Sequence, residues 1–421
     1  MGAARTSAEP HDGNVVEQEP ELVASTHGRW RVHQLNRPRA LNALTAGMVK
    51  AIRREYRDLC GEPGAARPPG APCAVLTEGR GGRAFCAGGD VVAVTTAPKS
   101  VLDDATSDFF HLEYSMNMEL ATQPLPQVSL WDGIVMGGGV GLSIHGAFRV
   151  ATERTVLAMP EVQIGLFPDI GASWFMPRLR GRYGAWLGLT GARITGAAAR
   201  ELGLATHLIA SSAIPALREE LLALEHPGEA SIRAVLDAAE LSHRAPHGGA
   251  VVPAEDLPPA QEVEAVFAPD EGITGVVARL EKTAQTSEWA RKALSQLQSA
   301  SPLAVCLTWR MLELGATSTL AEVLQREAVV ARRKLDARGP AGAGDFAEGV
   351  AAALVRRDKS PKWRHGSLDA VSAAEVEGFL TPLPGDTPLN LTWAEGWAAA
   401  GGRAPGSSVI AGGALPHRAA L

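Results

Sequence analysis

Two glycine-rich clusters each follow a stretch that is typical of a buried strand. They are residues 84–90 (AFCAGGD) and residues 136–141 (MGGGVG). Glycine between a strand and a helix lets a ligand approach bare backbone N–H groups, which carry a partial positive charge at the start of a helix. If both clusters converge on one oxygen, they form an oxyanion hole, which stabilises the intermediate of acyl transfer. The alternative is that the glycines only permit tight turns or close packing.

Neither cluster fits a nucleotide-binding motif. Residues 137–141 lack the GxGxxG spacing, and the chain has no Gly-Lys pair, so neither a dinucleotide fingerprint nor a Walker A loop is supported. A GxSxG nucleophile elbow fails at Gly141 because His145 occupies the position of the final glycine. His145 has no visible orienting partner, so it is expected to be a packed helix residue rather than a base.

Several carboxylates stand where a charge could do chemistry. Glu161 lies between an apolar strand, 156–159, and a further apolar segment, which is a costly place for a charge without a function. Glu113 lies in a helical stretch, where a solvated surface acid is the alternative reading. Asp90 ends the first glycine cluster and could cap a helix or contact a ligand.

The surrounding elements alternate between strands and helices. Apolar alternation predicts a strand over 28–36, and Thr45 is the expected N-cap of an amphipathic helix with Met48, Ile52 and Tyr56 on one face. Residues 73–77 and 127–131 read as buried strands, with a helix over 103–120 between them. This β-α-β-α-β order predicts a layered α/β domain.

The chain divides by composition into five parts. Residues 1–20 are polar and acidic, which predicts a disordered leader, and residues 21–240 form the α/β core that carries the site. Residues 241–272 are rich in Pro, His and acids, which indicates a linker or exposed excursion. Residues 273–380 are expected to be mainly helical, with helical spacing over 274–282, 288–297, 302–314, 319–334 and 345–356. The Gly/Ala/Pro-rich residues 381–421 predict a poorly ordered tail.

The composition of the 421 residues bounds the class of protein. With 46% apolar and 20% charged residues the chain is a globular protein, and a net charge of −6 argues against a general nucleic-acid or anionic-membrane binder. Four cysteines without a CxxC pair indicate reduced thiols of an intracellular protein, and no metal site is expected. The longest uncharged apolar stretch, 133–148, is short and interrupted by glycine, so a soluble protein is predicted.

In combination, these motifs resemble a known family. Residues 84–90, the GGGVG run, MPE at 159–161 and GLFPD at 165–169 resemble the crotonase (enoyl-CoA hydratase/isomerase) superfamily. MGGGVGLS, IGLFPD and SPKW at 360–363 resemble its 3-hydroxyisobutyryl-CoA hydrolase subgroup, and the similarity spans about residues 22–380. The resemblance implies a crotonase-like ββα spiral core of the α/β class with a mainly helical C-terminal region. It also implies an acyl-CoA substrate, no separate cofactor, and no nucleic-acid or membrane partner.

The resemblance assigns roles by position. The backbone N–H groups of Ala87 and Gly138 would bind the thioester carbonyl oxygen, and Glu161 and Asp169 would be the catalytic acids. Substrate contacts would come from the segment that lines the coenzyme A arm, from the first cluster and from one further active-site carboxylate. These residues are Arg39, Ala40, Leu41, Ala84, Gly88, Gly89, Asp90 and Glu113. Arg37 or Arg39 could offset the phosphate charge of coenzyme A, although exposed arginines before a helix are otherwise ordinary solvated residues.

One replacement separates hydrolysis from hydration. Hydratases of the superfamily carry a second glutamate where this chain has Gly141, and the hydrolase subgroup has an acid at the position of Asp169. The expected activity is hydrolysis of a short branched 3-hydroxyacyl-CoA, most closely 3-hydroxyisobutyryl-CoA to 3-hydroxyisobutyrate and CoA, as in valine catabolism. Glu161 is either the nucleophile or the general base. Ala172, where the subgroup usually has glycine, is expected to narrow the acyl pocket.

Two other functions stay open on the sequence. One is enoyl-CoA hydratase or isomerase activity on another acyl-CoA, and the other is a non-catalytic acyl-CoA-binding protein. Superfamily members often form trimers, so a homo-oligomer is open as well. The sequence does not decide between the cytoplasm and the mitochondrion.

Overall fold

The computed structural model describes residues 19–102, 104, 108–245, 253–336, 344–382, 384 and 386–404. Apart from Glu19 and Pro20, the predicted leader lies outside the described residues, as do residues 405–421 of the predicted tail.

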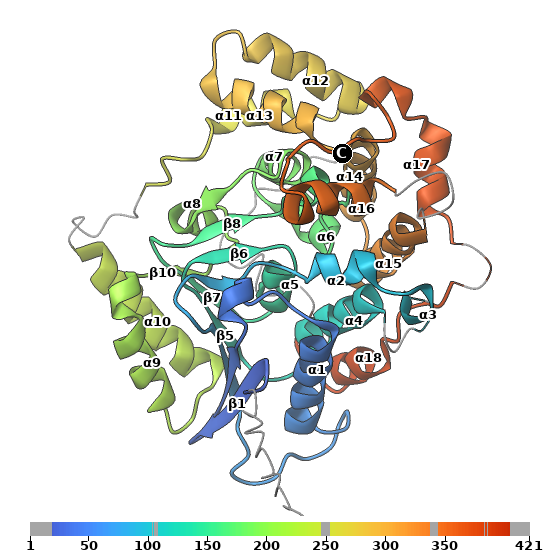
Figure 1. The fold of residues 1–421 in the computed structure, drawn as a ribbon. Helices are drawn as coiled ribbons and strands as arrows, with labels where there is room; N and C mark the ends of the chain where they lie inside the picture. The colour runs from blue at the N-terminus through green and yellow to red at the C-terminus, as the bar shows by residue number, and fades with distance from the viewer. Residues whose placement is uncertain are drawn as a thin grey trace, which may run out of the picture.

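A six-stranded sheet forms the larger layer of the core, in the order β1-β2-β3-β5-β7-β10 (Figure 1). The strands are β1 (Leu22–His27), β2 (Trp30–Leu35), β3 (Ala74–Gly79), β5 (Gln127–Trp131), β7 (Phe148–Ala151) and β10 (His207–Leu208). β1 and β2 form an antiparallel hairpin, and the others pair in parallel. The strand predicted over 28–36 is therefore the second arm of a hairpin. β1 escaped prediction because most of its side chains are half-buried or exposed.

A smaller sheet lies in the order β4-β6-β8-β9. Its strands are β4 (Ala84–Cys86), β6 (Ile134–Met136), β8 (Val156–Ala158) and β9 (Ile194–Thr195), of which the first three are parallel. Along the chain, β3 is followed by β4, β5 by β6 and β7 by β8, and each pair is followed by helices. This repeat is the predicted ββα spiral, so the predicted fold class is confirmed.

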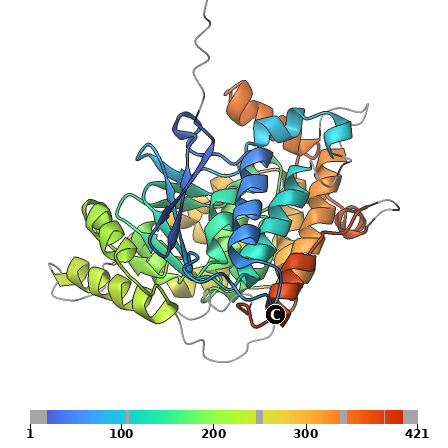
Figure 2. The same cartoon turned by 90° about the horizontal axis from the view of Figure 1, so that it is seen from below.

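Helices cover both faces of the large sheet (Figure 2). The helices of the core are α1 (Ala46–Cys60), α2 (Val91–Thr96), α3 (Lys99–Leu102), α4 (Phe109–Thr122), α5 (Gly138–Ile144), α6 (Ala172–Phe175), α7 (Tyr183–Thr190), α8 (Gly196–Glu201), α9 (Ile214–Leu222) and α10 (Glu229–Arg244). Thr45 caps α1 as predicted, since its hydroxyl accepts a hydrogen bond from the N–H of Met48 at 3.1 Å. The helix predicted over 103–120 begins later, after the N-cap Asp108.

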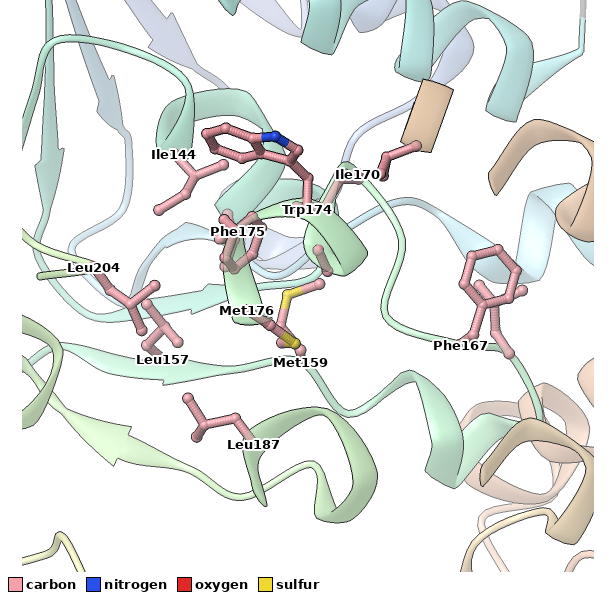
Figure 3. Close-up of a cluster of buried hydrophobic side chains, with 14 of the residues drawn as sticks. Ile144, Leu157, Met159, Phe167, Ile170, Trp174, Phe175, Met176, Leu187 and Leu204 are labelled. Carbon is pink, nitrogen blue, oxygen red and sulfur yellow. The ribbon is translucent and has the colours of Figure 1, made fainter. Parts of the chain in front are cut away.

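Two apolar clusters hold the layers together. On one face of the large sheet, Trp30, Leu76 and Val128 pack with Leu217 and Leu236 of α9 and α10. The other face belongs to a larger cluster that continues into the C-terminal helices. Figure 3 shows the part of the larger cluster around the segment that follows β8. That segment is consequently packed from several sides, which fixes its backbone.

The C-terminal region is mainly helical, as predicted. It comprises α11 (Ala260–Val266), α12 (Gly272–Thr283), α13 (Glu288–Ser299), α14 (Pro302–Gly315), α15 (Leu320–Asp336), α16 (Asp345–Val350), a π-helical turn over Ala351–Val355 and α17 (Ala373–Leu380). The linker predicted over 241–272 is too long. α10 continues to Arg244 and α11 begins at Ala260, while residues 246–252 lie outside the described residues.

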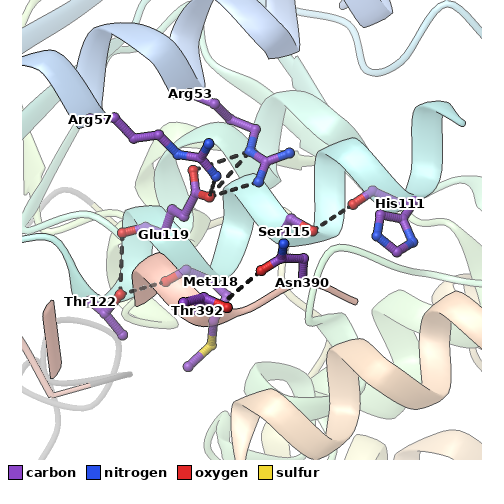
Figure 4. A network of polar contacts seen from close by, with 9 residues as sticks. All are labelled: Arg53, Arg57, His111, Ser115, Met118, Glu119, Thr122, Asn390 and Thr392. Atoms are coloured by element: carbon purple, nitrogen blue, oxygen red, sulfur yellow. Dashed lines mark hydrogen bonds and ion pairs between the residues drawn. The ribbon is translucent and has the colours of Figure 1, made fainter. Parts of the chain in front are cut away.

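The prediction of a poorly ordered tail is wrong for residues 386–404. They contain α18 (Thr392–Ala399), which packs against α4 (Figure 4). Trp397 is 2% exposed, and its indole N–H donates a hydrogen bond to the carbonyl of Gly61 at 3.1 Å. Trp393 stacks on the Arg57 guanidinium at 5.0 Å. Two tryptophans four residues apart supply the apolar face that the Gly/Ala-rich composition obscured.

Candidate active site

Three neighbouring parallel strands of the small sheet end at one cavity. β4 is followed by the glycines of the first cluster, β6 by those of the second, and β8 by the segment that carries Glu161. Because the carboxyl ends of parallel strands meet at one edge of a sheet, residues distant in sequence are brought together. The cavity measures about 350 Å³. Its walls include most of the predicted site residues, namely Ala40, Leu41, Ala87, Gly88, Gly89, Asp90, Glu113, Gly138, Glu161 and Asp169.

In the first cluster the N–H of Gly89, rather than that of Ala87, is directed toward the second cluster. The N–H of Ala87 donates a hydrogen bond to the carbonyl of Leu41 at 3.0 Å, so it is committed to the fold, and the role predicted for Ala87 is wrong. Gly89 forms a parallel bridge with Leu44 through the carbonyl of Gly88 and the N–H of Asp90. In such a bridge the N–H of the central residue points to the opposite side. There, the nitrogen of Gly89 lies 3.2 Å from the position that a Cβ on Gly138 would take.

Gly138 lies opposite Gly89 in the second cluster. It is the first residue of α5, where a backbone N–H has no partner within its own helix. Gly137 precedes it with φ of 47°, a conformation that glycine adopts readily. A Cβ on Gly88 would lie 3.7 Å from the Gly138 nitrogen, so the two clusters are in close contact. The two clusters thus converge as predicted, which leaves the N–H groups of Gly89 and Gly138 as the candidate oxyanion donors.

Glu161 lies beside the second cluster. It opens a 3₁₀ turn (Glu161–Ile164) directly after β8 and Pro160, and it is 6% exposed. Its Oε1 lies 2.8 Å from the position of a Cβ on Gly137, so only glycine leaves room for the carboxylate there. Burial raises the pKa of Glu161 well above its usual range, and the charge of Asp169 raises it further. The structure thus places the Glu161 carboxyl group against the second glycine cluster.

Glu113 and Asp169 complete a group of three acids. Glu113 lies on α4 at 2% exposure, and its carboxylate approaches Gly138 so closely that a Cβ on that glycine would collide with it. The solvated-helix reading of Glu113 is therefore wrong. The Tyr114 hydroxyl donates a hydrogen bond to Asp169 Oδ2 at 2.7 Å. Burial raises the pKa of Asp169 to about 6, while Glu113 has its pKa raised by burial and by the charges of Asp169 and Glu161.

This electrostatic arrangement makes a prediction about stability. Since the pKa of Glu113 is raised in the folded state, folding favours its protonated form, and that contribution is lost as the pH rises through the folded-state pKa. Glu113→Gln cannot ionise, so it avoids this loss. We expect its melting temperature to exceed that of the wild type by several degrees at about pH 8 and by clearly less at about pH 5. The unfolded wild-type chain releases the Glu113 proton above the ordinary glutamate pKa of about 4.3 while the folded state holds it, so the wild type loses stability as the pH rises. An equal difference at both pH values, measured by thermal unfolding, would contradict the account.

The thiol of Cys86 is not a competing nucleophile. Burial raises the pKa of Cys86 to about 12, and the attacking species of cysteine enzymes is the thiolate. All four cysteines are unpaired, in agreement with the prediction of reduced thiols. Among the described residues that line the cavity there is no Lys, Arg or His, and its ionisable side chains are those of Asp90, Glu113, Glu161 and Asp169.

Three of the predicted substrate contacts, Asp90, Ala84 and Arg39, differ in how the structure bears on their roles. Asp90 caps α2 and forms an ion pair with Arg37 at 3.0 Å. Arg37 also pairs with Glu21, so its positive charge is engaged by two carboxylates of the protein rather than left for a phosphate. Ala84 is buried within β4 with its carbonyl bonded to Asn42, away from the cavity wall, so a substrate contact is not supported. Arg39 is exposed and directly precedes Ala40 at the cavity, where its predicted role remains a prediction.

Gly141 has no space for a side chain. A Cβ on Gly141 would lie 2.7 Å from Cβ of Ile170 and 3.0 Å from Nδ2 of Asn117. The place of a second glutamate is thus filled by other residues. Ala172 is fully buried at the start of α6 and does not belong to the cavity wall, so the expectation that it narrows the acyl pocket is wrong.

Sequence reasoning missed residues whose partners come from distant elements. Tyr114 is fully buried and bonded to Asp169, although the two are 55 positions apart. Leu354 reaches the cavity from the π-helical turn of the C-terminal region. The SPKW motif lies behind that turn, since the N–H of Lys362 bonds to Glu348 of α16 and the Trp363 indole bonds to the carbonyl of Ser299. No local pattern signals these contacts.

The described ranges contain no group of three His, Cys, Asp or Glu side chains placed to hold a metal ion. Within the same ranges, no helix combines the length and the apolar character that a bilayer crossing requires.

The sequence agrees with the fold and the site in assigning a family. A sequence model described as enoyl-CoA hydratase/isomerase matches residues 30–380. The chain therefore belongs to the enoyl-CoA hydratase/isomerase family, the crotonase superfamily.

Within this family, the chain is similar to curated 3-hydroxyisobutyryl-CoA hydrolases. It is 38% identical to the mitochondrial 3-hydroxyisobutyryl-CoA hydrolase of Xenopus laevis, over 83% of this chain and 86% of the relative. Identity to the mitochondrial human enzyme of the same name is 35%, over 86% of this chain and 89% of the relative. A solved enoyl-CoA hydratase from Rhodobacter sphaeroides superposes with a TM-score of 0.71 at 33% identity, covering 88% of this chain and all of that one.

Proposed function

We propose that this protein hydrolyses 3-hydroxyisobutyryl-CoA to 3-hydroxyisobutyrate and coenzyme A. The observation that carries the proposal is that Glu161 lies beside the two glycine clusters while no acid stands at the position of Gly141. Glu161 lies against the second glycine cluster, while the place of a second glutamate, at Gly141, is filled by Ile170 and Asn117. Relatives at 35–38% identity over most of the chain are curated 3-hydroxyisobutyryl-CoA hydrolases, which supports the same activity here.

The proposed chemistry begins with the thioester carbonyl. Its oxygen accepts hydrogen bonds from the N–H groups of Gly89 and Gly138, which stabilise the negative charge that develops in the tetrahedral intermediate. Glu161 either attacks the carbonyl carbon to give a mixed anhydride, which water then cleaves, or takes a proton from the attacking water. On both routes water adds OH to the acyl group, and the departing sulfur takes up a proton to leave as free coenzyme A.

The other two acids act on the polar parts of the reactants. Asp169, held by the Tyr114 hydroxyl, accepts a hydrogen bond from the substrate 3-hydroxyl or from the water. Glu113 has a pKa raised by burial and neighbouring charges, so its protonated form persists to a higher pH than that of an exposed glutamate. It can then donate a hydrogen bond beside Gly138 without adding a third negative charge.

A panel of acyl-CoA thioesters tests this function. We expect the purified protein to release free thiol from 3-hydroxyisobutyryl-CoA fastest, and more slowly from isobutyryl-CoA, because the latter lacks the hydroxyl that Asp169 would bind. The measurement is thiol release with a thiol reagent. A protein that binds coenzyme A thioesters tightly but cleaves none of them would support the non-catalytic alternative.

Enoyl-CoA hydration is the second candidate, because solved relatives with this fold include an enoyl-CoA hydratase at 33% identity. Gly141→Glu tests whether the missing acid is all that separates the two activities. We expect no enoyl-CoA hydration from this variant and a fall in thiol release of roughly tenfold or more, because the new side chain must displace Ile170, the neighbour of Asp169. Substantial loss of enoyl-CoA absorbance in the variant would contradict this.

A further inference from the structure

The residue that follows Asp169 has a strained backbone. Ile170 has φ of 57°, in the left-handed region that a β-branched residue rarely adopts, and Gly171 follows with φ of 84°. Such a conformation costs roughly 1–3 kcal/mol and persists only where the surroundings hold it. The strained turn directly follows Asp169, an acid that the proposed function uses. The side chains that fix the turn therefore also fix the orientation of the Asp169 carboxyl group.

Two buried side chains from distant parts of the sequence hold the turn. The Nε2–H of His145, on the residue after α5, donates a hydrogen bond to the Ile170 carbonyl at 2.9 Å. Burial lowers the pKa of His145 to about 4, so the ring is neutral and Nε2 carries its proton. Glu327 binds the next residue of the turn, since its Oε2 accepts a hydrogen bond from the Gly171 N–H at 2.7 Å.

Glu327 makes further bonds within the same turn. Its Oε1 accepts hydrogen bonds from the Ser173 hydroxyl at 2.9 Å and from the Ser173 N–H at 3.3 Å. The Glu327 side chain is fully buried, and it is not among the residues that line the cavity. The Glu327 carboxyl group thus accepts hydrogen bonds from three donors of the turn, whereas His145 bonds to it at one point.

Glu327 comes from the C-terminal helical region rather than from the spiral core. It lies on α15, which packs against both α4, the helix of Glu113 and Tyr114, and α6, the helix that starts within the turn. The Gly171 and Glu327 positions are 156 residues apart in the chain. α15 therefore packs against the helix that carries Glu113 and against the helix that follows Asp169, next to two of the three acids of the site.

We propose that Glu327 is a positioning residue for the hydrolysis. By bonding Gly171 and Ser173, its carboxyl group holds the strained turn at Ile170 and thereby fixes Asp169 against the Tyr114 hydroxyl. The C-terminal helices thus contribute to the reaction without supplying a group that touches the substrate. This inference rests on the proposed function, because the reaction it supports is the cleavage of 3-hydroxyisobutyryl-CoA.

The test compares Glu327→Ala with Glu327→Gln in steady-state thiol release from 3-hydroxyisobutyryl-CoA. For Glu327→Ala we expect kcat to fall about 100-fold with KM within about threefold, since a displacement near 1 Å of a positioned group costs about that much. Glu327→Gln keeps one acceptor for the Gly171 N–H and should recover kcat to within about tenfold of the wild type. A general loss of folded protein would not produce this order.

A double variant separates positioning from stability. If Glu327 acts through Asp169, Asp169→Asn/Glu327→Ala should have the kcat of Asp169→Asn alone, because the turn then no longer positions a carboxylate.

Glu240 is the matched control, since it is a buried glutamate on α10 that also accepts a hydrogen bond from a backbone N–H, that of Leu208 at 3.0 Å. Glu240→Ala should lower the melting temperature but leave kcat of the folded protein within about twofold.

The outcomes distinguish this inference from the function beneath it. A wild-type protein that releases no thiol from 3-hydroxyisobutyryl-CoA would contradict the proposed function. A wild-type protein that does release thiol, combined with an unchanged kcat in Glu327→Ala or with fully additive losses in the double variant, overturns the role of Glu327 alone.

Discussion

Glu161→Gln should lower the rate of thiol release from 3-hydroxyisobutyryl-CoA by about 1,000-fold or more, because an amide can neither attack the carbonyl nor accept a proton from water. No other acid lines the cavity in the same place, since Glu113 lies against Gly138 and Asp169 is bonded to Tyr114. Neither can replace Glu161 without moving. The measurement is a thiol assay under saturating substrate.

The same substitution should not harm the fold. Burial and the charge of Asp169 raise the pKa of Glu161, so its ionised form destabilises the folded state, and a neutral amide removes that cost. The melting temperature of Glu161→Gln should equal or exceed that of the wild type, and coenzyme A thioesters should still bind. Glu153→Gln, the same change in the exposed turn between β7 and β8, is the control and should keep full activity. A Glu161→Gln protein that turns over like the wild type would exclude this site as the reaction centre.

Gly138→Ala is expected to have the second largest effect. A methyl group on Gly138 collides with the Glu113 carboxylate and comes within 3.2 Å of the Gly89 nitrogen, so the two oxyanion donors are forced apart. Loss of one such donor costs about 100- to 1,000-fold in kcat, and we expect a decrease in that range. KM should change much less, because the donors bind the transition state more strongly than the substrate.

Gly47→Ala is the matched control for Gly138→Ala. Gly47 is exposed within α1, and the nearest atom to a Cβ there is the Thr45 hydroxyl oxygen at 3.5 Å, an ordinary contact. The substitution should leave kcat unchanged and raise stability by up to about 1 kcal/mol, because alanine favours a helix more than glycine does. If both alanine variants kept full activity, the two glycine clusters would not form the oxyanion hole.

The layout of the fold could be predicted from the sequence where the local pattern decides the structure. The buried strands β3 and β5, the capped helix α1 and the helical C-terminal region all appear as expected. β1 was missed because its residues are half-exposed, and α18 was missed because two tryptophans carry its burial in a Gly/Ala-rich segment. In both cases tertiary packing, rather than local pattern, determines the element.

The site could be predicted in outline but not in its choice of atoms. The types and order of residues located the two glycine clusters and the three acids. They could not distinguish Gly89 from Ala87, because the direction of each N–H depends on how Leu41 and Leu44 pair with the first cluster. Glu327 was missed for a similar reason, since its bonds to a turn 156 residues earlier leave no trace in the local sequence.

The central claim is that this site cleaves a thioester rather than hydrating a double bond. The most direct measurement is product analysis by mass spectrometry after the wild-type protein has been incubated separately with 3-hydroxyisobutyryl-CoA and with methacrylyl-CoA, its dehydrated counterpart. We predict free coenzyme A and 3-hydroxyisobutyrate from the first substrate, and no hydrated thioester from the second. Formation of a hydroxyacyl-CoA from methacrylyl-CoA, with the thioester of the first substrate left intact, would contradict the account.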